Sequence, residues 1–265
     1  MKSMYHINQI PSERQIKKFI RRVVFGKNVF CPVCRSRKVV VFERRYRCRI
    51  CRCKFTLISH TWLKGMKLSY EKFWMVLWAW TASIPVMQTT ELTGLSRQAI
   101  ARWHDLFREH LPKDHVILGK IVQLDEAYFK GWSLVMGKEK GTRKIAFMMW
   151  KTSVERHHAV QFLEQHVKPG SILCTDGAWI YRAIEHWWPV EHAWDIHKRF
   201  EFGKTSEIEG MFGILRTFIR RMYHHVTPEK LPDYVGEFQA RFSSPEIFKD
   251  PRHYLSKTLS LVPFD

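Results

Sequence analysis

The sequence lacks a hydrophobic run long enough to cross a membrane, and it lacks an export signal. Its most apolar run, Phe73–Trp80, is much shorter than the roughly 20 residues that span a bilayer. Glu13 and several basic residues interrupt the first thirty positions, which therefore contain no continuous apolar core of the kind that secretory signals have. These absences predict a cytoplasmic protein with no membrane partner.

Acidic residues are scarce compared with basic ones, above all near the N-terminus. The 265 residues include 44 Lys and Arg against 25 Asp and Glu, and the net charge is +19. Residues 1–60 hold 16 of the basic residues but only two acids, Glu13 and Glu43, so +14 of the charge lies there. This excess predicts a polyanionic partner. The sequence also lacks internal repeats and low-complexity tracts, and its 45% hydrophobic content is enough for a packed core.

Six cysteines without an export signal favour metal binding over a disulfide framework. Cys31 and Cys34 form CPVC, Cys48 and Cys51 form CRIC, and the strand-forming residues between the two motifs predict a hairpin. Two such knuckles present four thiolates tetrahedrally, which is the zinc-ribbon arrangement. Cys53 is an alternative to Cys51 as the fourth ligand, although the spacing favours Cys51.

Residues 61–112 are predicted to be helical and to contain a helix-turn-helix. A helix that begins near residue 70 is followed by a break at Ile84-Pro85, a short helix over 86–92, a turn at 93–95 and a helix over 97–110. The last helix has three polar residues near its start, where such helices contact base edges. These candidate DNA-binding residues are Arg97, Gln98 and Arg102. A plain helical hairpin without a DNA-binding role is the alternative.

Three acids beyond residue 120 are candidate metal ligands. The strand-forming stretch Ile121–Phe129 alternates its side chains between two faces, so Gln123 and Asp125 share one face while Glu126 lies on the other. Asp176 follows a strand predicted over 171–175, and Glu209 lies in the first turns of a helix. The alternatives are a salt-bridged strand residue for Asp125 and a surface residue for Glu209.

The elements between these acids complete the predicted architecture. Strands are expected at 121–129, about 131–136 and about 143–152, and helices at roughly 155–167 and 179–187. The order of the three acids, on a first strand, a fourth strand and a late helix, is that of the ribonuclease-H-like fold. The predicted class is therefore α/β (α+β overall). The expected parts are a basic helical lead (1–28), a zinc ribbon (29–57), the helical segment (61–112), a mixed-sheet catalytic domain (120–242) and a C-terminal tail (243–265).

The sequence resembles an insertion-sequence DDE transposase of the bacterial group that carries an N-terminal zinc ribbon. The matching stretches are CPVC and CRIC, LDEAYF, CTDGAW, IEGMFGILR and YHHVTPEKLPDYVGEFQARF. The family commonly has His-Thr-Asn before the Ile-Glu pair, where this chain has Lys204, Thr205 and Ser206. Its usual lysine seven residues after the glutamate is Arg216 here, which keeps the charge but presents a planar fork.

The acids and the resemblance together predict metal-dependent DNA cleavage and strand transfer. Two Mg²⁺ ions, or Mn²⁺, held by Asp125, Asp176 and Glu209 would neutralise the clustered carboxylates, and Arg216 would contact the DNA backbone. The resemblance implies structural Zn²⁺, binding to transposon ends and target DNA, and a homo-oligomer assembled on the DNA. A DNA-binding regulator or inactive remnant is the alternative function, and a stand-alone nuclease is a third.

Overall fold

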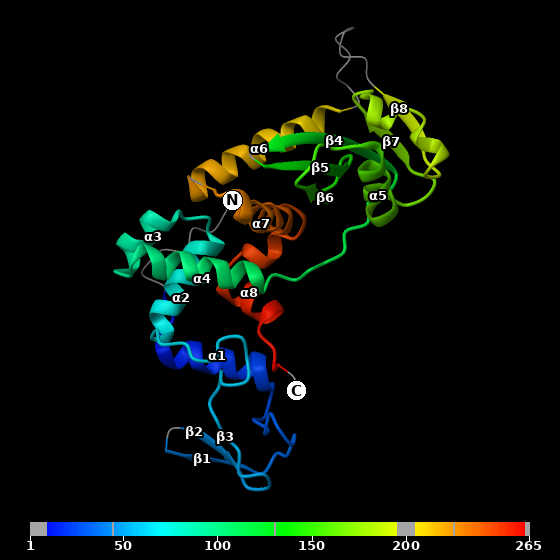
Figure 1. Cartoon of the computed structure of the whole chain (residues 1–265). Coiled ribbons are helices and arrows are strands. Elements are labelled where there is room, and N and C mark those ends of the chain that lie inside the picture. The colour runs from blue at the N-terminus through cyan, green and yellow to red at the C-terminus, as the bar shows by residue number, and fades with distance from the viewer. Residues whose placement is uncertain (1–9, 44, 130, 195–204, 225, 263–265) are drawn as a thin grey trace. The chain divides into compact units, whose positions relative to one another are not determined.

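The computed structural model describes residues 10–43, 45–129, 131–194, 205–224 and 226–262 (Figure 1). The chain divides into two compact units, one formed by residues 1–110 and 246–265 and the other by residues 111–245. Within the described ranges, no helix combines the length and the apolar character that a membrane crossing requires. Lys204, which the sequence comparison singled out, lies outside the described residues.

The first unit is a helical body with a small sheet. Its helices are α1 (Glu13–Phe25), α2 (Tyr70–Thr81), α3 (Val86–Thr93), α4 (Arg97–Glu109) and α8 (Pro251–Thr258). The Ser69 and Ser96 hydroxyls accept hydrogen bonds from the third residues of α2 and α4, as N-caps do. Gly94 ends α3 with a left-handed φ of 67°. Two helices joined by a three-residue turn therefore follow α2, as the helix-turn-helix pattern predicted.

Aromatic side chains form the core of this helical body. Trp80 of α2, Phe107 of α4 and Tyr254 of α8 are fully buried, and their ring centroids lie 5.2–5.8 Å apart. The Tyr254 hydroxyl donates a hydrogen bond to the Phe107 carbonyl at 2.8 Å. Burial of three large rings is a major stabilising contribution. The C-terminal segment is therefore part of the core that holds α2 and α4.

The small sheet has the order β1-β2-β3 and is antiparallel. Its strands are β1 (Val39–Phe42), β2 (Arg45–Cys48) and β3 (Lys54–Phe55). Tyr46 stacks on Phe55 at 5.4 Å, and Phe55 in turn contacts Phe25 of α1 at 6.0 Å. The hairpin expected between the two cysteine motifs is thereby confirmed, and its apolar side packs against α1.

The second unit is built on a five-stranded mixed sheet with the order β6-β5-β4-β7-β8. The strands are β4 (Ile121–Phe129), β5 (Trp132–Glu139), β6 (Ile145–Trp150), β7 (Ile172–Thr175) and β8 (Glu191–Trp194). The first three are antiparallel neighbours, whereas β7 runs parallel to β4 and β8 runs parallel to β7. This topology confirms the expected ribonuclease-H-like mixed sheet.

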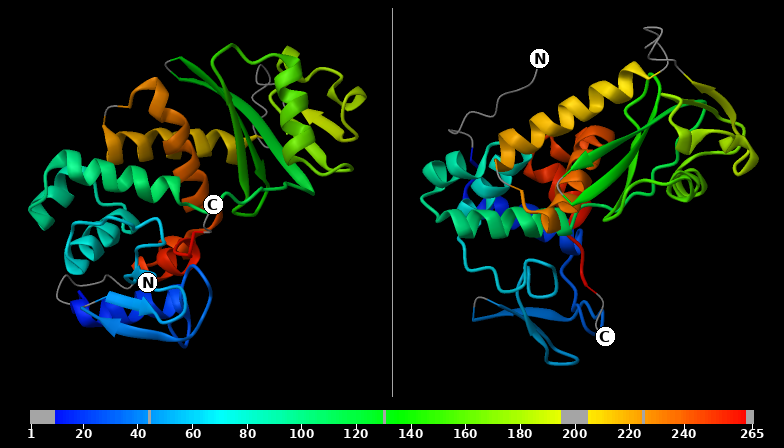
Figure 2. Two further views of the ribbon diagram at one scale, coloured as in Figure 1. Left: turned by 60° about the horizontal axis from the view of Figure 1, so that its bottom comes forward. Right: turned by 45° about the horizontal axis from the view of Figure 1, so that its top comes forward.

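Helices cover both faces of this sheet. Helix α5 (Arg156–His166) lies on one face, and α6 (Ser206–Tyr223) and α7 (Leu231–Ser243) lie on the other (Figure 2). Val122 and Leu124 pack in the core on the α5 side, while Ala127 packs in the core on the α6 side. The alternation predicted for Ile121–Phe129 is therefore confirmed, because neighbouring side chains enter two separate cores.

The structure corrects two expected elements. The helix predicted over 179–187 is instead two 3₁₀ turns, Trp179–Tyr181 and Ile184–His186, separated by Ala183 at a left-handed φ of 55°. Strand β5 extends to Glu139, past the end expected near residue 136. Gly137 lies inside the strand. A side chain at this position would clash, because its Cβ would come within 2.7 Å of the Phe162 ring. This glycine permits close packing and does not form the turn.

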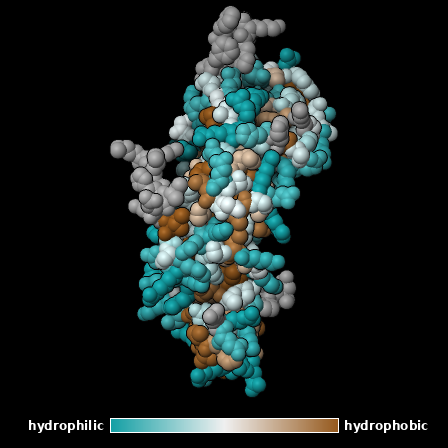
Figure 3. Space-filling view, turned by 90° about the vertical axis from the view of Figure 1, so that its left-hand side faces the viewer, coloured by the Kyte–Doolittle hydropathy of each residue, from teal (hydrophilic) through white to brown (hydrophobic). Residues whose placement is uncertain are grey.

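The surface seen in Figure 3 is mostly hydrophilic, with smaller apolar patches between charged and polar side chains. In the zinc-ribbon segment, Val41 and Ile50 are 75% and 59% exposed. Exposed apolar residues that occur singly on a soluble domain require no special role.

Candidate active site and metal centres

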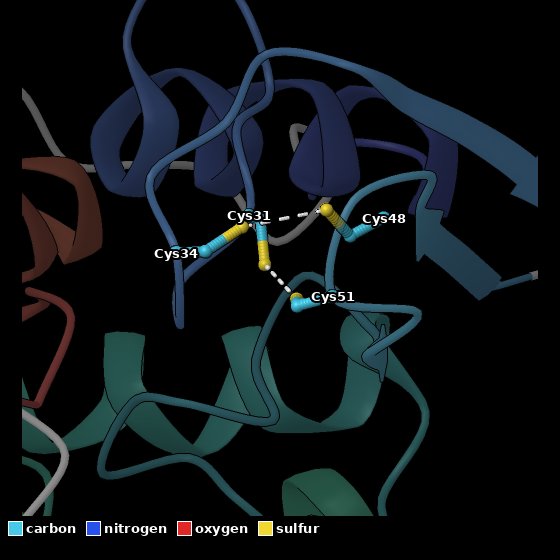
Figure 4. A group of neighbouring side chains, drawn as sticks. All are labelled: Cys31, Cys34, Cys48 and Cys51. Atoms are coloured by element: carbon cyan, nitrogen blue, oxygen red, sulfur yellow. Dashed lines mark hydrogen bonds between the residues drawn. The ribbon is translucent and has the colours of Figure 1, made fainter.

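Four cysteines from the two knuckles converge in the N-terminal unit (Figure 4). Their sulfur atoms all lie within 4.8 Å of one another, with Sγ–Sγ separations of 3.4 Å for Cys31–Cys51 and 3.5 Å for Cys34–Cys48. Cys31 and Cys48 are buried, whereas Cys34 and Cys51 are exposed. Four thiol ligands at this spacing fit a structural zinc ion.

Local backbone geometry prepares this cluster to hold a cation. Burial alone would raise the pKa of Cys48, but the Cys51 and Ile50 backbone N–H groups and the Cys34 and Cys51 thiols lower that pKa to about 6. A thiolate is the form that binds metal. Cys53 lies outside the four-sulfur group, and its Sγ is 3.8 Å from the Lys54 carbonyl oxygen. The geometry therefore favours Cys51 over Cys53 as the fourth ligand.

The three residues proposed to bind DNA all lie at the start of α4 and are exposed. Gln98 and Arg102 are four residues apart, so they share a helix face. Both line a cleft of about 560 Å³ together with residues 62–68, which include Lys64 and Lys67. Arg97 is not among the residues that line this cleft. Gln98 and Arg102 therefore line the same cleft, whereas Arg97 does not.

Asp125 lies in the middle of β4, in the part of the strand that contacts the start of α6. Two residues earlier, the buried Gln123 accepts a hydrogen bond at its Oε1 from the Ile208 backbone N–H at 2.9 Å. This bond joins β4 to the first turn of α6. Asp125 itself is partly buried, and its Oδ1 accepts the Glu126 backbone N–H at 2.8 Å. Gln123 and Asp125 share a face of the strand, so Asp125 also points toward the side of the sheet on which α6 and its first-turn residue Glu209 lie.

Asp176 follows β7 directly, next to the strand that carries Asp125. The register pairs Gln123 with Cys174, so Asp125 and Asp176 lie at the same level of neighbouring parallel strands. The Asp176 Oδ1 accepts the Ala178 backbone N–H at 3.0 Å. Gly177 between them has a φ of 76°, which a residue with a Cβ rarely adopts. This turn holds the carboxylate at the carboxyl end of the sheet.

Glu209 lies in the first turn of α6 and is exposed. Its Oε1 accepts a hydrogen bond from the buried Thr205 hydroxyl at 3.0 Å. The neighbouring Glu207 faces elsewhere: its Oε2 is 2.6 Å from the Nζ of the buried Lys138, and its pKa is lowered chiefly by that hydrogen bond. Glu207 thus holds α6 against β5, whereas Glu209 lies on a different side of the helix, where it accepts the Thr205 hydroxyl.

Asp125 lies close enough to Asp176 and Glu209 for their charges to affect its ionisation. Burial raises the pKa of Asp125 to about 7, and the negative charges of Glu126, Asp176 and Glu209 add to that rise. In the described ranges, only the four cysteines form a group of three or more ligands whose atoms all lie within 4.8 Å of one another. The carboxylates of Asp125, Asp176 and Glu209 do not form such a compact group in the part of the chain that the structure describes.

Glu126 and Tyr181 belong to this site, although neither was among the residues predicted for it. The fully buried Tyr181 donates a hydrogen bond from its hydroxyl to the Glu126 Oε2 at 2.6 Å. Burial raises the pKa of Glu126, the Tyr181 hydrogen bond opposes that rise, and the charge of Asp176 adds to it. Glu126 lies on the opposite sheet face, as alternation predicted, yet its charge reaches both aspartates. The contact between Tyr181 and Glu126 was not predicted, because the two residues are 55 positions apart and the 3₁₀ turn that carries Tyr181 was expected to be part of a helix.

Arg216 lies two helical turns after Glu209 and is exposed on α6. Its guanidinium lies over the Phe129 ring, 5.8 Å from the ring centroid. Phe129 ends β4, four residues after Asp125. The expected sharing of a helix face between Glu209 and Arg216 follows from their spacing of seven residues.

Comparison with known families agrees with this geometry. Residues 117–243 match the ISXO2-like transposase domain, a range that includes the five-stranded sheet, α5, α6 and α7. This segment is an ISXO2-like transposase domain. No curated protein matches the chain. The match supports the resemblance to insertion-sequence DDE transposases, a family that implies DNA binding and the use of divalent metal ions.

Carboxylate oxygens are the donors that Mg²⁺ and Mn²⁺ prefer. Burial and then the charges of Glu126, Asp176 and Glu209 raise the pKa of Asp125, and a divalent cation bound there would offset both effects. The donor set therefore fits the divalent metals that the transposase domain implies.

Proposed function

We propose that the chain is an insertion-sequence transposase that binds the terminal inverted repeats, cuts the DNA ends and joins them to target DNA. Asp125 and Asp176 lie at the same level of neighbouring parallel strands, and Gln123 joins β4 to the first turn of α6, which carries Glu209; this arrangement, inside a segment that matches a transposase domain, supports the proposal. The three acids come from β4, the end of β7 and the start of α6. They would act together as the metal ligands.

The roles of the side chains follow from their positions. Divalent cations bound there would lower the pKa of a water molecule or a DNA 3′-hydroxyl and stabilise the oxygen that leaves phosphorus. Asp125, Asp176 and Glu209 would hold the cations, and no covalent intermediate with the protein is needed. Arg216 would contact a phosphate of the same strand through its planar fork. Gln98 and Arg102 would select the DNA ends, and the zinc ribbon would add basic contacts to the backbone.

Cleavage of labelled duplexes, first selected for binding from a random pool, tests the proposal. Wild-type protein should cut and join these duplexes with Mg²⁺ or Mn²⁺ but not with Ca²⁺. Asp125→Asn, Asp176→Asn and Glu209→Gln should each lower the rate by at least about 10³-fold while retaining DNA binding. Double variants should be no slower than single ones, because the acids act as one unit.

Arg216→Ala should slow the reaction without removing the metal, because the side chain lies against Phe129 and is expected to contact DNA. Wild-type protein that binds its selected DNA but never cuts it would support a regulator in place of a transposase. Cutting of any duplex without preference for the selected ends would indicate a nuclease.

A further inference from the structure

We infer that a second site on the transposase domain, beside the C-terminal half of α6, binds one unpaired nucleotide of the DNA. The inference rests on the proposed function, since the DNA must reach the acids for this site to be used. The site is a cleft of about 340 Å³. Its walls come from the end of β4, from α6 and from residues 226–231. This volume lies at the lower end of the range for small-molecule sites, which suits a single nucleotide.

One wall of the cleft is cationic. Arg216, Arg220 and His224 all line it; Arg216 and Arg220 are four residues apart on α6, and His224 is the residue that follows the helix end. Arg216 and Arg220 share a helix face, and His224 lines the same cleft, so all three can approach one ligand. No acidic residue is found among the described residues that line the cleft. Two guanidinium groups and an imidazole are suited to a phosphodiester and its sugar oxygens.

The remaining wall is apolar, which a phosphate alone would not require. Its residues are Phe129, Ile219, Val226, Pro228 and Leu231, and Thr227 also lines the cleft. The Arg216 guanidinium lies over the Phe129 ring, 5.8 Å from the ring centroid. Unpaired bases stack on aromatic rings and on arginine planes. The combination of a planar apolar floor with a cationic wall therefore points to a base with its attached phosphate.

The cleft is close enough to the acids for one DNA strand to reach both. Phe129 lies four residues beyond Asp125 on β4, or about 13 Å at the rise of a strand. Arg216 lies seven residues beyond Glu209 on α6, or about 10 Å at the rise of a helix. DNA advances about 3.4 Å per nucleotide along one strand. The cleft would therefore receive a nucleotide roughly three to four positions from the reacting phosphate.

Binding of two duplexes that differ by one nucleotide tests the inference. One duplex is fully paired, and the other carries a single unpaired 5-iodo-2′-deoxyuridine. Both are mixed with full-length protein and Ca²⁺, so that binding is measured without cleavage. Wild-type protein should prefer the duplex with the unpaired nucleotide by about 5- to 100-fold, the range that one base–aromatic stack contributes. Irradiation should crosslink the iodinated base to the peptide that contains Phe129.

Matched variants separate this site from general DNA binding. Phe129→Leu keeps an apolar side chain but removes the ring, so it should abolish both the preference and the crosslink. Arg220→Gln should weaken binding of the unpaired nucleotide, whereas Arg221→Gln, which changes an exposed neighbour outside the cleft, should not. Equal affinity of the wild type for both duplexes, or an unchanged preference in Phe129→Leu, overturns the inference.

Failure of the nucleotide-site inference can be distinguished from failure of the proposed function. A wild type that cuts and joins DNA ends but shows no preference for the unpaired nucleotide contradicts the inference alone. A wild type that shows the preference and the Phe129 crosslink but never cuts DNA with Mg²⁺ contradicts the proposed function and leaves the nucleotide site standing.

Discussion

Asp125 is a residue whose ionisation the fold opposes. Its pKa rises from 3.8 to about 7, first because the carboxyl is buried and then because other acids lie nearby. An acid with a raised pKa in the folded state contributes stability that is complete below pH 3.8 and is lost as the pH rises to about 7. Above that pH, ionised Asp125 lowers the free energy of unfolding in the absence of metal, by at most about 4 kcal/mol at about 1.4 kcal/mol per pH unit.

Asp125→Asn should therefore stabilise the metal-free protein at pH 8, by about 1–3 kcal/mol after allowance for partial exposure. The Asn oxygen can still accept the Glu126 N–H, and its NH₂ group can donate to neighbouring carboxylates. Thermal unfolding in the presence of a chelator measures the effect, which should shrink toward pH 4. Mg²⁺ should stabilise the wild type but not the variant. A variant no more stable than the wild type at pH 8 would contradict this account of Asp125.

At the scale of elements, the start of α6 is fastened to the sheet at two points. Gln123 accepts the Ile208 N–H, and Glu207 binds the buried Lys138 Nζ and accepts the Gly141 backbone N–H at 3.3 Å. These contacts set the position of the first turn, which carries Glu209. Glu207 supports the active site indirectly, because it positions the helix and does not face the other acids.

Glu207→Gln should lower the free energy of unfolding by about 1–3 kcal/mol, since Lys138 loses a charged partner in a mostly buried position. Because the pKa of Glu207 is lowered, its contribution is present above pH 4.5 and is lost as the pH falls below that value. Unfolding of wild type and variant at pH 7 and pH 3 checks the difference, which should be smaller at pH 3. The variant should need more Mg²⁺ for half-maximal cleavage, whereas Ser206→Ala, which changes the adjacent exposed residue, should not.

The zinc ribbon is the element that depends most directly on a metal. Structural zinc contributes folding free energy outright, and the small sheet has few buried residues of its own. Purified protein should contain about one zinc per chain. Cys31→Ser and Cys48→Ser should lose that zinc and unfold the ribbon, while the transposase domain stays folded.

Cys53→Ser is the matched control, because Cys53 lies outside the four-sulfur group. It should retain the zinc. Metal analysis together with limited proteolysis of residues 29–57 measures both effects. Zinc loss from Cys53→Ser equal to that from Cys31→Ser would contradict the assignment of Cys51.

At the scale of the whole molecule, the uneven charge predicts how DNA binding depends on salt. Each phosphate contact contributes roughly −0.9 to the slope of log affinity against log salt. Replacing Arg22, an exposed residue of α1, by Ala should weaken binding to all sequences alike and reduce the slope by about one. Gln98→Ala and Arg102→Ala should instead relax discrimination between sequences, by about 5- to 150-fold for each lost base contact.

Binding titrations at several salt concentrations, with selected and scrambled duplexes, measure both quantities. Arg97→Ala should lose less discrimination than the other two variants, because Arg97 does not line their cleft. Full discrimination by both the Gln98 and the Arg102 variants would show that α4 is not the helix that recognises the DNA sequence.

The sequence by itself determined the features that depend on local spacing. Knuckle spacing placed the four cysteines, N-cap residues placed α2 and α4, and period-two alternation assigned Asp125 and Glu126 to opposite faces of β4. Each of these depends on residues a few positions apart, whose geometry the backbone of one element dictates.

Only the tertiary structure decided which distant residues meet. Tyr181 reaches Glu126 across 55 positions, Lys138 pairs with Glu207, and Tyr254 packs beside Phe107. No local pattern marks these partners, because their contact depends on strand order and on helix packing and not on sequence spacing. The same holds for β8, a four-residue strand whose pairing with β7 is non-local. The charges that raise the pKa of Asp125 therefore become apparent only once the sheet and α6 are assembled.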